Sequence, residues 1–178
     1  MNLANKLTIL RIMLVPIFMI FLLNKIPYGV TIAAVIFTFA AITDTLDGYI
    51  ARKKNQITNF GKFMDPLADK LLVSAALISL VQMGKLSAWV VMIIIAREFT
   101  ISILRAVAAA EGVVIAASWW GKAKTITQIV AIIFILIDNF PFSYIGFPFA
   151  SIMMYIAVII TVLSGVDYIR INQHILKH

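Results

Sequence analysis

The chain has 178 residues, of which 62% are hydrophobic and 13% charged, and its mean hydropathy is +1.02. A soluble protein carries roughly a quarter charged residues, and one compact water-soluble domain could not hide this much apolar surface, so a soluble helical bundle is disfavoured. The lack of cysteine removes disulfides, thiolate zinc sites and thiol nucleophiles. The net charge of +7 is better explained by basic residues beside membrane spans than by nucleic-acid binding.

Long apolar stretches predict an all-α, polytopic membrane protein with a six-transmembrane-helix bundle, because a bilayer core about 30 Å thick needs on the order of 20 helical residues. The predicted spans are 7–24, 28–50, 67–83, 87–110, 125–137 and 145–169. The fifth is short and the first contains Arg11 and Pro16, so each is expected to tilt, kink or begin at the interface. Helix-breaking residues such as Gly61, Pro66 and Gly121 are expected to lie in the segments that connect the spans. Without a long linker or repeat, residues 1–178 are expected to form a single transmembrane domain.

Basic residues are distributed unevenly across these six spans. One side receives thirteen of them: Lys6, Arg11, Arg52, Lys53, Lys54, Lys62, Lys70, Arg97, Arg105, Lys122, Lys124, Arg170 and Lys177. The other side receives only Lys25 and Lys85. Since basic residues near span ends stay in the cytoplasm, both termini are predicted to be cytoplasmic, as are the connections after the second and fourth spans.

Half of the eight acidic residues lie at the predicted cytoplasmic ends of the second and third spans: Asp44, Asp47, Asp65 and Asp69. At about 100° per residue, the first two share one arc of the second helix, and the last two are one turn apart on the third. Gly48, Ala51 and Arg52 fall on the same arc of the second helix. Two acidic stripes can therefore face each other, and Pro66 is compatible with the first turn of the third helix.

Four carboxylates in a poorly solvated site would repel one another unless cations were bound, so the pattern predicts divalent metal. Oxygen ligands favour Mg²⁺ or Mn²⁺, and paired ions are a recurrent device for phosphoryl transfer. The small side chains of Gly48 and Ala51 would let a bulky nucleotide approach the helix backbone. Two alternatives are helix caps paired with neighbouring basic residues, and a cation pathway through a transporter. The transporter leaves Gly48, Ala51 and the basic cluster unexplained.

The pattern D-x2-D-G-x2-A-R-x8-G-x3-D-x3-D over residues 44–69 resembles the signature of the CDP-alcohol phosphotransferase family, with every fixed position present. The six-span layout is also similar to that family. The resemblance implies two divalent ions, Mg²⁺ or Mn²⁺, bound by Asp44, Asp47, Asp65 and Asp69. It implies that Asp69 is also the catalytic general base. The implied CDP pocket consists of Asp44, Asp47, Gly48, Ala51, Arg52 and Gly61. A homodimer is expected from the resemblance as well.

A second group of charges lies in and after the fourth span. Arg97, Glu98 and Arg105 project within roughly 100° of one another, and Lys122 and Lys124 precede the fifth span. Such charges are costly in a bilayer unless they are paired or face a water-filled cavity. Beside an anionic nucleotide, two arginines and two lysines suggest an acceptor that carries phosphate. Alternatively, Arg97 and Glu98 satisfy each other and the lysines only mark the cytoplasmic side.

Residues 5–11, 97–105 and 121–125 resemble phosphatidylglycerophosphate synthases, a branch of the same family. This resemblance implies an enzyme of phospholipid biosynthesis that transfers the phosphatidyl group of CDP-diacylglycerol to sn-glycerol 3-phosphate. The acceptor phosphate would contact Arg97, Arg105, Lys122 and Lys124. The expected location is a bacterial cell membrane, in contact with its lipid, with a cytoplasmic active site. Serine, inositol phosphate and phosphatidylglycerol stay open as acceptors, as does a lipid-binding protein without activity.

Overall fold

The computed structural model describes residues 3–53, 59–110, 112–113 and 119–172. This part of the chain contains long α-helices, one short 3-10 helix and no strand, which confirms the predicted all-α class. The elements are α1 (Leu3–Leu23), α2 (Gly29–Lys53), α3 (Asn59–Gln82), α4 (Ala88–Ala110), α5 (Trp119–Leu136), η1 (Phe142–Ile145) and α6 (Phe149–Ile171).

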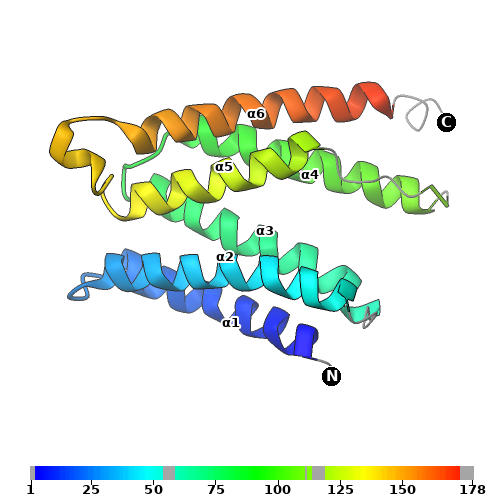
Figure 1. Cartoon of the computed structure of the whole chain (residues 1–178), viewed down its shortest axis with the longest axis horizontal. Helices are drawn as coiled ribbons and strands as arrows, with labels where there is room; N and C mark the ends of the chain where they lie inside the picture. Colours follow the sequence, from blue (N-terminus) through cyan, green and yellow to red (C-terminus); the bar gives the residue numbers. More distant parts are fainter. Residues whose placement is uncertain (1–2, 54–58, 111, 114–118, 173–178) are drawn as a thin grey trace.

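The six helices run back and forth along the long axis of the molecule (Figure 1). The first residues of α1 and the last of α6 lie toward the same end, together with the end of α2, the start of α3 and the end of α4. We call this the charged end. The turns from α1 to α2 and from α3 to α4, together with η1, lie at the other end, which we call the turn end. An even number of passes therefore brings the start of α1 and the end of α6 to the charged end.

The outer surface of the bundle is apolar. Large exposed side chains occur on every helix, among them Met13, Val35, Ile78, Met92, Ile126 and Ile159. Within the described residues, three segments are long and apolar enough to cross a membrane: Asn5–Leu23, Trp119–Leu136 and Phe149–Ile171. A shorter apolar stretch, Gly29–Thr43, belongs to α2. The chain is therefore an integral membrane protein. The other three long helices, α2, α3 and α4, carry most of the charges discussed above.

Two predicted boundaries are wrong. Helix α3 begins at Asn59, so Gly61 and Pro66 lie within it, and Pro66 is not in its first turn. Helix α5 begins at Trp119 and includes Gly121, so the fifth helix is not short. The apolar pattern marks only the part of a helix that lies in hydrocarbon, whereas headgroups and water can solvate a polar helical extension. Pro66 lies exposed within α3 and removes one backbone donor from that helix.

The main apolar core lies toward the turn end and receives side chains from all six helices. Its largest fully buried members are Phe18, Phe37, Leu77, Leu80, Ile94, Ile132 and Leu136. The rings of Phe18 and Phe37 lie 5.9 Å apart and join α1 to α2. A much smaller cluster, formed by Ile101, Leu104 and Tyr168, joins α4 to α6 toward the charged end. Apolar packing therefore secures the turn end more thoroughly than the charged end.

Tight turns and aromatic contacts complete the turn end. Gly84 and Gly146 adopt positive φ values of 72° and 66°, a conformation that suits glycine because it has no Cβ. Phe142 of η1 stacks on Phe149 of α6 with ring centroids 4.5 Å apart. These contacts return the chain into α6, which packs along α5 and also against α4.

Candidate active site

The acidic motif spans the end of α2 and the first half of α3. Asp44, Asp47, Gly48, Ala51 and Arg52 belong to the last three turns of α2, whereas Gly61, Asp65 and Asp69 belong to α3. These two segments lie together at the charged end, and α2 contacts α3 (Figure 1). Among the fixed positions of the motif, the structure describes only the side chain of Asp69. The side chains of the other seven lie outside the described part.

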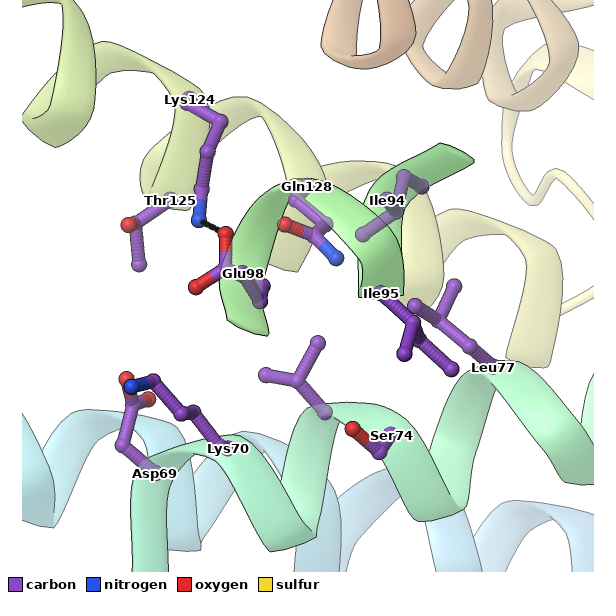
Figure 2. A pocket seen from close by; sticks show the side chains of 11 residues that line it. Asp69, Lys70, Ser74, Leu77, Ile94, Ile95, Glu98, Lys124, Thr125 and Gln128 are labelled. Atoms are coloured by element: carbon purple, nitrogen blue, oxygen red, sulfur yellow. Dashed lines mark hydrogen bonds and ion pairs between the residues drawn. The ribbon is translucent and has the colours of Figure 1, made fainter. Parts of the chain in front are cut away.

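A pocket opens between α3, α4 and α5 directly beside Asp69 (Figure 2). Its lining consists of Asp69, Lys70, Val73, Ser74, Leu77, Ile94, Ile95, Glu98, Lys124, Thr125 and Gln128. The half-buried Asp69 comes from α3 and rises from it toward the side of the pocket that holds Lys124 and Glu98. The pocket therefore connects the acidic motif to the second charged group.

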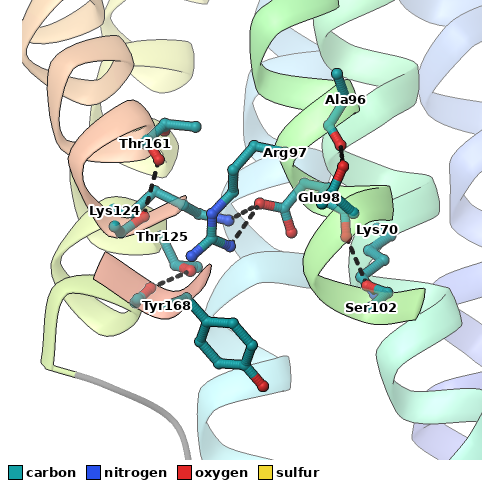
Figure 3. A network of polar contacts seen from close by, with 12 residues as sticks. Lys70, Ala96, Arg97, Glu98, Ser102, Lys124, Thr125, Thr161 and Tyr168 are labelled. Carbon is teal, nitrogen blue, oxygen red and sulfur yellow. Dashed lines mark hydrogen bonds and ion pairs between the residues drawn. The ribbon is translucent and has the colours of Figure 1, made fainter. Parts of the chain in front are cut away.

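Glu98 lies between two cations. Its Oε1 accepts hydrogen bonds from the Nζ of Lys124 on α5 and, at 3.3 Å, from the Nη1 of Arg97 on α4. The Lys124 side chain is only 6% exposed and that of Arg97 13% exposed. These two cations share one carboxylate. With Lys70 and Asp69, which also line the pocket, three cations lie near two carboxylates among the described residues. Figure 3 shows the network of polar contacts around Glu98.

Arg97 reaches this position because α6 has no side chain in its way. A Cβ on Gly165 would lie 3.2 Å from the Cγ of Arg97, closer than an ordinary contact. The buried Nε of Arg97 has no hydrogen-bond partner in the described part of the protein. The guanidinium therefore retains a donor in addition to the one that it gives to Glu98.

Lys70 and Ser102 tie α3 to α4 on the other side of Glu98 (Figure 3). The Nζ of Lys70 donates to the Oγ of Ser102, which in turn donates to the backbone oxygen of Glu98 at 2.6 Å. This chain of contacts fixes the backbone of Glu98 relative to Asp69, because Asp69 and Lys70 are neighbours on α3.

The structure brings only part of the predicted acceptor group to the pocket. Lys124 lines it, and Arg97 adjoins it through Glu98. Arg105 is exposed; its Nε donates to the hydroxyl of Tyr168 at 3.1 Å, and its guanidinium lies 5.4 Å from the centre of that ring. Lys122 is also exposed. Neither Arg105 nor Lys122 belongs to the pocket lining.

Two polar features were not assigned a role from the sequence. Asn5, Thr8 and Arg11 are all buried on α1, which packs against α2 and α3. Gln128 is 2% exposed and lines the pocket one helical turn after Lys124. The sequence signal for Gln128 is its spacing, because a polar residue four positions after Lys124 lies on the same face of α5.

The side chains of the acidic motif are of the chemical type that binds a divalent metal. Four aspartates offer only oxygen ligands, the preference of Mg²⁺ and Mn²⁺. The three- and four-residue spacings place each pair on one helix face, and the two helix segments adjoin. Among the described side chains no group of three possible ligands occurs, since Asp44, Asp47 and Asp65 lie outside that set.

A sequence model of the CDP-alcohol phosphatidyltransferase family matches residues 1–163. The CDP-diacylglycerol–glycerol-3-phosphate 3-phosphatidyltransferase of Bacillus subtilis strain 168 is 49% identical over 188 aligned positions, covering 99% of this chain and 97% of the relative. The protein of the same name from Haemophilus influenzae is 41% identical, with 97% and 94% covered. A probable phosphatidylglycerophosphate synthase from Mycobacterium tuberculosis is 43% identical, with 94% and 80% covered.

Proposed function

This chain belongs to the CDP-alcohol phosphatidyltransferase family, and we propose that it transfers the phosphatidyl group of CDP-diacylglycerol to sn-glycerol 3-phosphate. The products are phosphatidylglycerophosphate and CMP, so the reaction is a step of phospholipid biosynthesis. The similarity over nearly the whole chain to relatives named for this transfer carries the proposal. The pocket beside Asp69 supports it, because buried cations suit an acceptor that carries phosphate.

The acidic motif is the proposed metal and nucleotide site. Members of this family generally use divalent metal ions, and we propose two, Mg²⁺ or Mn²⁺, between the carboxylates of α2 and α3. Such ions neutralise phosphate oxygens and the charge that develops on a leaving group. The proposed ligands are Asp44, Asp47, Asp65 and Asp69. The proposed CDP pocket adds Gly48, Ala51, Arg52 and Gly61 to the first two aspartates.

Asp69 is the proposed general base. Its half-buried carboxylate lines the pocket in which Lys124 would hold the acceptor phosphate. Asp69 would take the proton of the primary hydroxyl while that oxygen attacks the lipid-side phosphorus. A new phosphorus–oxygen bond forms, the bond to the bridging oxygen of the diphosphate breaks, and CMP leaves with that oxygen. Holding both reactants in one pocket supplies the required orientation.

Four basic residues are proposed to bind the acceptor phosphate: Arg97, Arg105, Lys122 and Lys124. Lys124 and Arg97 are the inner pair, because both are largely buried and contact Glu98. Arg105 and Lys122 are exposed and would act at the entrance, where they attract an anion from solution.

A purified, detergent-solubilised protein tests this function directly. With CDP-diacylglycerol, CMP should be released on addition of sn-glycerol 3-phosphate but not of serine, inositol phosphate or phosphatidylglycerol. Release with another acceptor alone would replace the proposed substrate within the same family. No release with any acceptor, in the presence of Mg²⁺ or Mn²⁺, would contradict the proposed transfer.

The proposed orientation places both termini and the charged end in the cytoplasm, following the distribution of lysine and arginine. Single cysteines can be introduced without background, since the chain has none. Tyr144→Cys in η1, where the native side chain is 82% exposed, should react with an impermeant thiol reagent outside intact cells. Asn55→Cys should react only after the membrane is opened, and the reverse pattern would overturn the orientation. We further propose one catalytic domain over residues 1–178 and a homodimer, as the family resemblance implies.

A further inference from the structure

Gln128 carries a buried hydrogen-bond donor that no described residue satisfies. Its Nε2 has no partner, although the residue is only 2% exposed. It lies in the apolar helix α5, where lipid offers no replacement for a missing hydrogen bond. A buried amide in such a place needs a polar partner, so the contents of the pocket are the available source.

Two of the polar side chains that share the pocket with Gln128 have other partners. Glu98 accepts from Lys124 and Arg97 through Oε1, and the hydroxyl of Thr125 donates to the backbone oxygen of Gly121 at 3.1 Å. The carboxamide of Gln128 instead projects into the pocket beside Glu98 (Figure 2). The carboxamide therefore lies at the edge of the space in which a bound molecule would lie.

The position of Gln128 relative to its neighbours indicates which group of the acceptor it would contact. Lys124 lies one turn away on the same face of α5 and would hold the acceptor phosphate. Asp69, across the pocket on α3, would face the reacting hydroxyl. A neutral carboxamide matches a neutral hydroxyl oxygen, whereas cations match a phosphate.

Building on the proposed function, we infer that Gln128 is a specificity residue that donates a hydrogen bond to the secondary hydroxyl of the acceptor. The bond selects a phosphorylated polyol over a phosphorylated alcohol that has only the reacting hydroxyl. It also orients the primary hydroxyl toward Asp69. A site that is built to bond a hydroxyl discriminates against a substrate that lacks it, because the site's own polar group is then left unpaired.

The test compares two acceptors in the purified full-length enzyme: sn-glycerol 3-phosphate, and 3-hydroxypropyl phosphate, which lacks the secondary hydroxyl. Wild-type kcat/KM should be about tenfold lower for 3-hydroxypropyl phosphate, the size expected for one neutral hydrogen bond. Gln128→Met keeps the length of the side chain and removes the donor. It should lower kcat/KM for sn-glycerol 3-phosphate by about tenfold and leave that for 3-hydroxypropyl phosphate unchanged, so that the discrimination disappears.

Gln128→Leu provides a second variant without the donor and should give the same result. Thr127→Val is the matched control on α5, because the Thr127 hydroxyl donates to the backbone oxygens of Ala123 and Lys124 and does not line the pocket. This control should keep the wild-type discrimination. Thermal melting in detergent establishes that each variant is folded.

An equal loss with both acceptors would show that Gln128 has a structural role or binds only water, and would overturn the inference. Unchanged discrimination in folded Gln128→Met and Gln128→Leu would overturn it as well, while leaving the transfer reaction intact. Absence of CMP release from wild-type enzyme with sn-glycerol 3-phosphate is a different result, which contradicts the proposed function itself.

Discussion

The two ends of the bundle both contain a lysine–carboxylate pair, but the pairs differ in their surroundings. At the turn end, the Nζ of Lys85 lies 2.6 Å from the Oδ1 of Asp138, whose side chain is 78% exposed. At the charged end, Lys124 is 6% exposed and shares Glu98 with Arg97. A solvated pair is worth little energetically, whereas an excess of buried positive charge is costly until an anion is bound.

The apolar packing also differs between the two ends of the bundle. Phe18, Phe37 and Leu77 are fully buried in the main core toward the turn end. The charged end has the small Ile101, Leu104 and Tyr168 cluster and a polar pocket. The comparison teaches that apolar packing is concentrated toward the turn end, whereas buried charge is concentrated around the proposed substrate pocket.

The largest effect should come from removing divalent metal. Chelation is expected to abolish CMP release, and Mg²⁺ or Mn²⁺ should restore it, because without these ions nothing neutralises the charge of the diphosphate beside the aspartates. Helix content measured by circular dichroism should persist, since the apolar packing toward the turn end does not depend on metal. Full activity in thoroughly chelated enzyme would contradict the proposal that the site uses metal.

Asp69→Asn should lower turnover by about a hundredfold to ten-thousandfold, the usual contribution of a general base. Asp138→Asn is the matched change at the turn end and should leave turnover near that of the wild type, because Asp138 is exposed, lies between α5 and η1, and does not line the pocket. Steady-state CMP release measures both variants. If Asp69→Asn kept near-normal turnover, Asp69 would not be the base.

Lys124→Met should raise the KM for sn-glycerol 3-phosphate by about tenfold to a hundredfold and leave the KM for CDP-diacylglycerol nearly unchanged. The reason is the loss of a charge-assisted contact, worth roughly 1.5–3 kcal/mol. Lys85→Met makes the same chemical change in the solvated pair and should alter neither KM. Should folded Lys124→Met retain the wild-type KM for the acceptor, the buried cation would be only a partner of Glu98.

Gly165→Ala should have the smallest effect. The added methyl group would lie 3.2 Å from the Cγ of Arg97, so the flexible side chain must shift by a few tenths of an ångström. We expect an increase of about twofold to threefold in the KM for sn-glycerol 3-phosphate, with a larger increase for Gly165→Leu, since overpacking costs grow with added volume. If both variants kept the wild-type KM for sn-glycerol 3-phosphate, Arg97 would not take part in acceptor binding.

Much of the architecture was predictable from local sequence features. Apolar stretches predicted the six helices, and the spacing of Asp44, Asp47, Asp65 and Asp69 identified the family signature, because helical periodicity and residue chemistry are local properties. The starts of α3 and α5 were misplaced because an apolar run does not mark where a helix ends in polar surroundings.

Only the tertiary structure decided which charges meet. The sequence grouped Arg97 with Arg105 on one helix face, and packing against α6 places Arg97 beside Gly165 and Arg105 beside Tyr168, while α5 brings Lys124 to Glu98. Gln128 likewise acquires its place in the pocket from the packing of α5 beside α3 and α4. These contacts join residues far apart in the chain, and their partners depend on how helices rotate and cross, which one helix's periodicity cannot determine.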